Sequence, residues 1–171
     1  MGTVLFLSLR ALHVLLSATW LGATVMMTFI VMPSAEATGP AGGQVMMAMN
    51  KRGLTAFFAS LGGITVLTGF YLYWHFTGGF DPEVSRSHAG VAFGIGGLAG
   101  LIAVILGGAV VGRSAGKMVE VMEKAVNLPD NQRGPLMQEA NGLRQKMKSF
   151  GTIVLILQVI ALLLMSVGHY I

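Results

Sequence analysis

Cysteine is absent from the 171 residues of this chain. Its absence excludes disulfide bonds, thiolate zinc sites, iron–sulfur clusters with cysteine ligands and covalently attached c-type haem. A metal ion bound by the chain would therefore need histidine, methionine or carboxylate ligands.

Charged residues are scarce as well. They make up 11% of the chain, against roughly 25% in soluble domains, whereas 54% of the residues are hydrophobic. The hydrophobic residues form four blocks, at about residues 4–32, 54–76, 89–112 and 150–171. Each block reaches the roughly 20 residues that a helix needs to cross a hydrocarbon core of about 30 Å. The sequence predicts an all-α integral membrane four-helix bundle, a single domain over residues 1–171 in contact with the lipid bilayer.

None of the seven acidic residues lies inside a hydrophobic block. This argues against a proton-coupled transporter, because such proteins relay protons through carboxylates within the membrane. The sequence also contains no phosphate-binding loop, Ser–His–Asp set or nucleic-acid-binding motif. It assigns no reaction to the chain, and we expect no nucleic-acid partner.

Lysine and arginine are concentrated in two of the connections. Lys51 and Arg52 follow the first block, and the connection between the last two blocks holds Arg113, Lys117, Lys124, Arg133, Arg144, Lys146 and Lys148. The only other basic residues, Arg10 and Arg86, lie near the opposite ends of the hydrophobic blocks. Because loops rich in Lys and Arg stay in the cytoplasm, the pattern predicts a multi-pass protein of a bacterial inner membrane with both termini outside.

The connection at about residues 114–149 has its own pattern. Helix-forming residues lie on both sides of a Leu128-Pro129-Asp130-Asn131 turn, and Gly134-Pro135 forms a second break. After it, apolar residues recur at steps of four and three into the fourth block, at Leu136, Ala140, Leu143, Met147, Phe150, Val154 and Leu157. This spacing is typical of a helix–helix seam. It predicts a cytoplasmic helical hairpin that extends transmembrane helices 3 and 4.

Each hydrophobic block contains or directly follows one histidine toward its predicted outer end, namely His13, His75, His88 and His169. One histidine per helix at similar height can hold a cofactor between helices. The alternative is that His75, His88 and His169 are interfacial residues, together with an aromatic belt of Tyr71, Tyr73, Trp74 and Tyr170. His13 lies deeper in its block, and ionisable residues there favour a functional role.

Polar residues also align within the blocks. Arg10, His13, Ser17, Trp20 and Thr24 recur at steps of three and four, which places them on one helix face. Two similar faces consist of Thr65, Thr68, Leu72 and His75, and of Gln158, Leu162, Met165 and His169. We expect these faces to point toward one another. The alternative is ordinary hydrogen bonding between helices through Ser, Thr and Gln.

The third block is rich in glycine, with small-residue pairs at 90/94, 96/100 and 108/112. Such pairs let another helix approach the backbone closely, so this block is a candidate surface for packing or for an oligomer contact. A second interpretation is that this glycine-rich block forms one wall of a haem site.

Methionines gather near the opposite end from the histidines, at Met26, Met27 and Met32 in the first block and at Met46, Met47 and Met49 beyond it. Thioethers are ligands for Cu(I), so copper binding is one hypothesis. Methionine is also a common packing residue.

The run Arg10-Ala11-Leu12-His13, followed by Trp20-Leu21-Gly22, resembles the first helix of the copper-resistance D type membrane proteins and of the bacterial membrane protoporphyrinogen oxidases. The similarity covers about residues 8–105 and continues through Met32-Pro33, Lys51-Arg52-Gly53-Leu54, Thr68-Gly69 and His88-Ala89. In the oxidase family the two matching histidines are associated with haem b or porphyrin. The resemblance therefore implies His13 and His88 as ligands, although Gly90 replaces that family's lysine.

The favoured hypothesis is a b-type haem protein that transfers electrons, with quinone or other subunits of a redox complex as its partner. His13 and His88 would be axial ligands, and His75 and His169 a second pair or alternatives, so that one or two haems bind. Arg10 and Arg86 would neutralise propionates. The alternatives are a copper-handling protein and an accessory subunit without catalytic activity.

Overall fold

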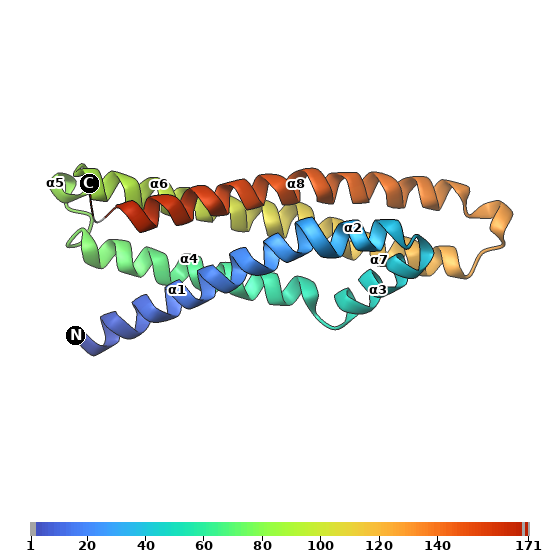
Figure 1. Ribbon diagram of the computed structural model, residues 1–171, viewed down its shortest axis with the longest axis horizontal. Coiled ribbons are helices and arrows are strands. Elements are labelled where there is room, and N and C mark those ends of the chain that lie inside the picture. Colours follow the sequence, from blue (N-terminus) through green and yellow to red (C-terminus); the bar gives the residue numbers. More distant parts are fainter. Residues whose placement is uncertain (1–2, 169, 171) are drawn as a thin grey trace.

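The computed structural model describes residues 3–168 and residue 170. These residues form helices joined by short turns, and no strand occurs among them. Four helical stretches are long and apolar enough to cross a membrane, and they cover Thr3–Ala37, Leu54–Phe76, His88–Val126 and Gly134–Val167. They lie side by side along the long axis of the molecule, and both chain ends lie at the same end of it (Figure 1).

The first stretch consists of α1 (Thr3–Met26), the π-helix η1 (Met27–Val31) and α2 (Met32–Ala37). The helix therefore continues past Pro33, where the sequence predicted its end. The carbonyl that a proline ring normally meets is four residues earlier, at Phe29, and Phe29 belongs to the wider π turn. This local change in geometry accommodates the proline within a continuous helix.

The other elements follow the predicted blocks more closely. Helix α4 (Leu54–Phe76) has the predicted bounds, and α6 (His88–Leu106) with the π-helix η2 (Gly107–Gly112) fills the third block. Helix α7 (Arg113–Val126), a short 3₁₀ turn η3 (Asp130–Gln132) and α8 (Gly134–Val167) form the predicted helical hairpin. Helix α8 ends four residues before the predicted end at 171.

The connection between the first two stretches contains a helix that the hydrophobic pattern does not predict. Helix α3 (Pro40–Lys51) begins with a proline in its first turn, which is a favourable position for proline. It contacts α7, and Lys51 at its end forms an ion pair with Glu123. A second small helix, α5 (Pro82–Ser85), precedes α6, and Asp81 caps it.

The four long stretches share one core at mid-length. It contains one buried residue from each of them: Trp20 from α1, Leu61 from α4, Ala103 from α6 and Val154 from α8. Around this core α1 packs on α4, and α6 packs on α8. Glycine allows the close approach that the sequence predicted, since a Cβ at Gly96 would lie 3.3 Å from Cε of Met165 on α8, which is tighter than most Cβ contacts.

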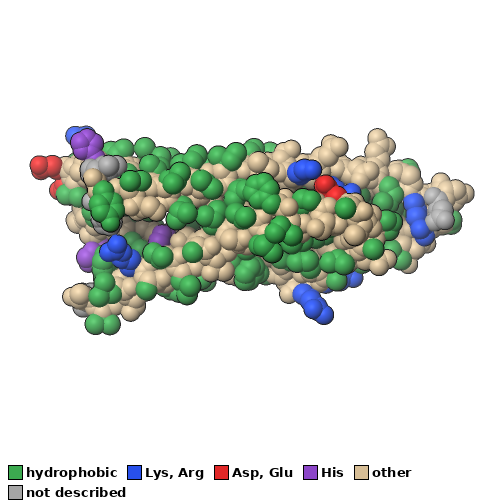
Figure 2. Space-filling model, viewed as in Figure 1, with side chains coloured by type: hydrophobic (Ala, Val, Ile, Leu, Met, Phe, Trp, Pro, Cys, Tyr) green, Lys and Arg blue, Asp and Glu red, His purple; other side chains and the backbone are tan. Residues whose placement is uncertain are grey.

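The outer surface is apolar, unlike that of a soluble protein. Large hydrophobic side chains are exposed along all four stretches, with Leu67 72%, Phe70 63% and Leu163 58% exposed, whereas the interior is rich in alanine, glycine and threonine. Figure 2 shows such hydrophobic side chains along the length of one face. Since exposing this surface to water would be unfavourable, it is suited to contact with a lipid bilayer.

Candidate functional site

His13 lies between α1 and α4 and is half-buried. Its Nδ1 is 2.9 Å from the backbone carbonyl oxygen of Thr65 and 3.1 Å from the hydroxyl oxygen of Thr68. A carbonyl oxygen only accepts hydrogen bonds, so Nδ1 carries the proton and donates. The neutral ring then presents Nε2 with a free lone pair, which is the arrangement of a histidine that ligates a metal through Nε2.

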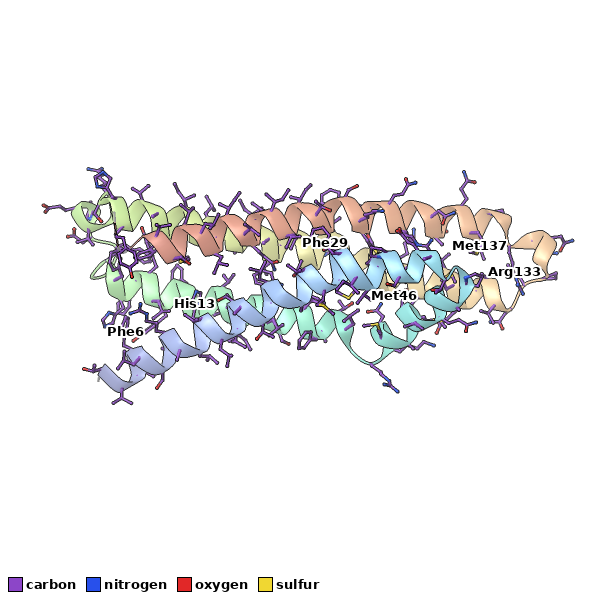
Figure 3. The ribbon with its side chains drawn as sticks, in the orientation of Figure 1. Phe6, His13, Phe29, Met46, Arg133 and Met137 are labelled. Atoms are coloured by element: carbon purple, nitrogen blue, oxygen red, sulfur yellow. The ribbon has the colours of Figure 1, made fainter. Side chains whose placement is uncertain are left out.

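Gly69 makes room for the His13 ring on α4. A Cβ added at this glycine would lie 2.8 Å from Cε1 of His13, which is closer than van der Waals contact permits. The glycine thus allows the ring to reach the carbonyl of Thr65. The labelled side chain of His13 is seen on α1 where this helix passes α4 (Figure 3).

Two buried residues near the middle of the helices have polar atoms without a hydrogen-bond partner among the described residues. They are the hydroxyl oxygen of Thr65, which is 7% exposed, and the side-chain amide of Gln158, which is 5% exposed. An unpaired amide or hydroxyl in an apolar interior costs roughly 1–3 kcal/mol. Each of these groups therefore carries a desolvation cost that no hydrogen bond among the described residues offsets.

The residues of the polar face predicted for the first helix differ in how deeply they are buried. Trp20 and Thr24 are buried, Ser17 is half-buried and Arg10 is exposed. The hydroxyl groups of Ser17 and Thr24 donate to carbonyls of their own helix, at Val14 and Trp20. Only His13 on this face forms a side-chain hydrogen bond to another helix, within the part of the chain that the structure describes.

The other predicted histidines have different surroundings. His75 is exposed. The centroid of its ring lies 4.6 Å from the ring centroid of Phe6 and 6.3 Å from that of Tyr71. These contacts are typical of an interfacial aromatic cluster. His88 is exposed at the first position of α6, after the capping residue Ser87. His169 lies outside the described residues.

Among the described histidines, His13, His75 and His88, the structure brings none against another. His13 forms no hydrogen bond or ring contact with His75 or His88, and the described residues contain no group of three or more histidines and acids that could hold a metal ion. Arg86 is exposed at the end of α5, near His88 in sequence. The arrangement around His13 therefore offers one histidine ligand rather than a preformed pair.

A cavity of about 220 Å³ lies toward the hairpin end of the molecule. We call it the methionine cavity, because seven methionines line it: Met27, Met32, Met46, Met47, Met118, Met122 and Met147. Four of these belong to the predicted group of six. The other three could not be predicted from the sequence, since they lie on α7 and α8 and only the fold brings them to the same place.

Both π-helices contribute to the wall of the methionine cavity, η1 through Met27 and Thr28, and η2 through Gly107, Gly108, Val111 and Gly112. π-Helices are rare in proteins, but those that occur are often found at functional sites. No protein-family model, curated protein or solved structure matches the chain. The resemblance to the copper-resistance and oxidase families stays a prediction.

Proposed function

We propose that the chain is a b-type haem-binding membrane protein that transfers electrons, alone or as a subunit of a redox complex. The observation that carries this proposal is the His13 ring, whose Nδ1 proton is engaged by the Thr65 carbonyl. This leaves Nε2 free. Haem ligands in helical membrane proteins need such a fixed ring within the hydrophobic region.

The residues around His13 fit a haem ligand in three respects. Thr65 holds the ring in one tautomer, Gly69 provides the space beside it, and Arg10 lies three residues before His13 on α1. A guanidinium at this position is suited to a propionate. When bound, haem would supply one-electron oxidation and reduction; the chain's part is to hold the ring, balance charge and exclude water.

The support differs between the two predicted axial ligands. His13 is half-buried and oriented, whereas His88 is exposed at the start of α6 and contacts no other described histidine. The proposal therefore depends on His13, with His88, His75 or His169 as candidates for a second ligand.

The proposed topology is a four-helix transmembrane bundle in a bacterial inner membrane. Both termini and the His13 site lie on the outer side, and the α7–α8 hairpin lies in the cytoplasm. The asymmetry of lysine and arginine supports this orientation. It places haem at the outer leaflet, where quinone or another subunit could exchange electrons with it.

The absorption spectrum of the purified protein tests the proposed function. After expression with ample haem, we expect a Soret band and a pyridine haemochrome of b type, at one haem per chain or two if a second pair of ligands is used. Protein that is folded and membrane-inserted but has no Soret band would contradict the proposal.

Copper handling is the second candidate, because the fold gathers seven methionines around one cavity. It predicts that the purified protein retains Cu(I) and that Met27→Leu lowers the amount retained. The accessory-subunit hypothesis instead predicts tight co-purification with other subunits and full function in variants that lack the histidines.

A further inference from the structure

The methionine cavity has a polar end and an apolar end. Arg144, Asn50 and Glu36 lie in its wall toward the hairpin, whereas Trp20 and Val154 lie in its wall at the shared core. The residues of α8 that line the cavity run from Arg144 to Val154. At 1.5 Å per residue, this distance is about 15 Å, or half of a hydrocarbon core of about 30 Å.

Arg144 has an unusual environment for a charged residue. It is half-buried, lines the cavity, and forms no ion pair or hydrogen bond with the described residues. Glu36, the carboxylate in the described cavity wall, pairs with Lys148 instead, and two further carboxylates of the described residues pair with other lysines, Glu123 with Lys51 and Glu139 with Lys117. The guanidinium is thus free to bind an anion that is not part of the chain.

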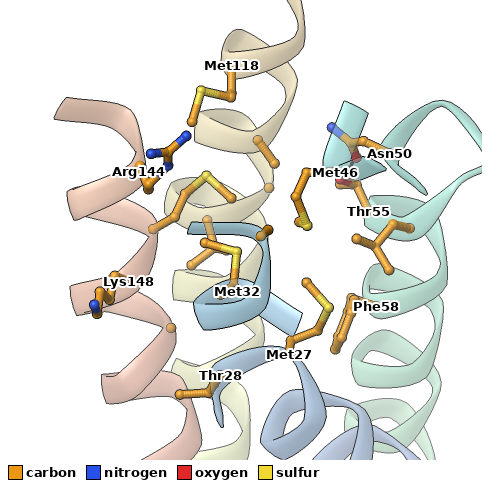
Figure 4. Close-up of a pocket in the computed structure, with 18 of the residues that line it drawn as sticks. Met27, Thr28, Met32, Met46, Asn50, Thr55, Phe58, Met118, Arg144 and Lys148 are labelled. Carbon is orange, nitrogen blue, oxygen red and sulfur yellow. Dashed lines mark hydrogen bonds between the residues drawn. The ribbon is translucent and has the colours of Figure 1, made fainter. Parts of the chain in front are cut away.

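Figure 4 shows how these groups are arranged. Met27, Met32, Met46 and Met118 surround the cavity, and Arg144 extends from α8 in the direction of Met118. Lys148, one turn further along α8, is directed away from the methionines and pairs with Glu36. Of the two cations in the described lining, Lys148 is therefore paired and Arg144 is not, and methionines make up much of the remaining wall.

Methionine side chains can bind two kinds of ligand, namely Cu(I) and an apolar chain. The cavity of about 220 Å³ is larger than a single ion needs, and larger than the engineered cavities of about 150 Å³ that hold benzene. An unpaired guanidinium in the wall repels a cation and attracts an anion. Methionine side chains adapt to apolar partners of irregular shape. These features together favour an amphiphile.

We propose that the methionine cavity binds a single-chain anionic amphiphile of the fatty-acid class, with its acyl chain between the methionines and its head group at Arg144. The site is separate from the His13 site and does not depend on haem. If the hairpin is cytoplasmic, the amphiphile comes from the inner leaflet, with its chain directed toward the bilayer centre as in the leaflet itself.

Trp20 in the cavity wall provides the signal for a test. The only other tryptophan, Trp74, is exposed on α4 near its far end, so Trp74→Phe leaves Trp20 as the sole emitter. In detergent micelles, a stearic acid dibrominated along its chain should quench Trp20 saturably. The matched uncharged probe is the dibrominated stearyl alcohol, which has the same chain and no carboxylate.

Arg144→Gln should weaken the apparent affinity for the acid by about tenfold or more, because it removes the charge-assisted hydrogen bond to the carboxylate. Arg144→Lys should restore most of the affinity, because it keeps the positive charge. Neither variant should change quenching by the alcohol. Equal quenching by both probes in all variants, or an acid affinity that Arg144→Gln leaves unchanged, would overturn the proposal.

A second variant fills the cavity. Gly151 lines it, and a Cβ added there meets no atom within 4 Å, so Gly151→Leu can occupy the space without a backbone clash. It should abolish saturable quenching by both probes. The control is Gly97→Leu, at an exposed glycine of α6 that also has open space and lies outside the cavity. Two results together would assign the cavity to copper instead. They are tight Cu(I) binding that the acid does not displace, and quenching of Trp20 by the dibrominated acid that does not saturate.

Discussion

The Nδ1 atom of His13 donates a hydrogen bond of 2.9 Å to the backbone carbonyl oxygen of Thr65. This contact joins α1 to α4 across 52 residues of sequence. It also fixes which ring nitrogen carries the proton, so that Nε2 is the atom available to a ligand. The chemistry proposed for the His13 site depends on this one bond.

Gly69→Ala should displace the His13 ring, because the new methyl group would lie 2.8 Å from Cε1. Overpacking of this kind costs roughly 1–3 kcal/mol, which exceeds the gain of up to about 1 kcal/mol from the higher helix propensity of alanine. We expect a lower unfolding temperature in detergent and a shifted or weakened haem spectrum.

Gly63→Ala is the control for this variant, since it lies on the same helix and its Cβ would meet no atom within 4 Å. It should leave the spectrum unchanged and the stability equal or slightly higher. If both alanine variants behave alike, the contact between Gly69 and His13 has no role in positioning the ring.

Thr68→Val should have a small effect. It removes a hydroxyl that lies 3.1 Å from Nδ1 of His13 and donates to the carbonyl of Ile64 at 2.8 Å. The carbonyl of Thr65 still accepts from His13 in this variant, and such bonds in membrane proteins are worth about 0.6 kcal/mol on average. Haem content measured by pyridine haemochrome should stay close to that of the unmodified protein. Complete loss of haem would mean that Thr68, rather than Thr65, fixes the ring.

Gln158→Met should stabilise the haem-free protein by roughly 1–3 kcal/mol, because it replaces a buried amide that lacks a partner with an apolar side chain of similar length. Thermal unfolding in detergent, after preparation without haem, measures this. A loss of stability in the haem-free protein would show that the amide is satisfied within the chain. If the amide serves a ligand, the same variant should lower haem affinity.

Much of the fold could be predicted because bilayer thickness constrains helix length. Helix α4 has the predicted bounds, and the hairpin turns at the predicted Leu128–Asn131 segment, where α7 ends at Val126 and α8 begins at Gly134. The apolar seam on the return arm is confirmed, since Ala140 and Val154 are buried and the rest of the seam is half-buried. These features depend on local hydrophobicity and on residues that break helices.

Other features depend on tertiary packing and could not be predicted. The continuation past Pro33 requires the π turn of η1, for which the sequence has no recognised signal. His13 was expected to face other histidines, but its observed partner is a backbone carbonyl, which any residue at position 65 would provide. The methionine cavity likewise combines residues from separate helices, and their convergence follows only from the packing of α3, α7 and α8.

The haem-to-protein ratio of His13→Ala, measured by pyridine haemochrome together with the size of the protein in detergent, tests the central claim most directly. We expect a folded, membrane-inserted protein of normal size without the haem that His13 holds, because the hydrophobic helices stay in the bilayer without the iron bond. His75→Ala should retain full haem if only one haem binds, and about half if there are two. A His13→Ala protein with full haem and an unchanged spectrum would show that His13 is not an axial ligand.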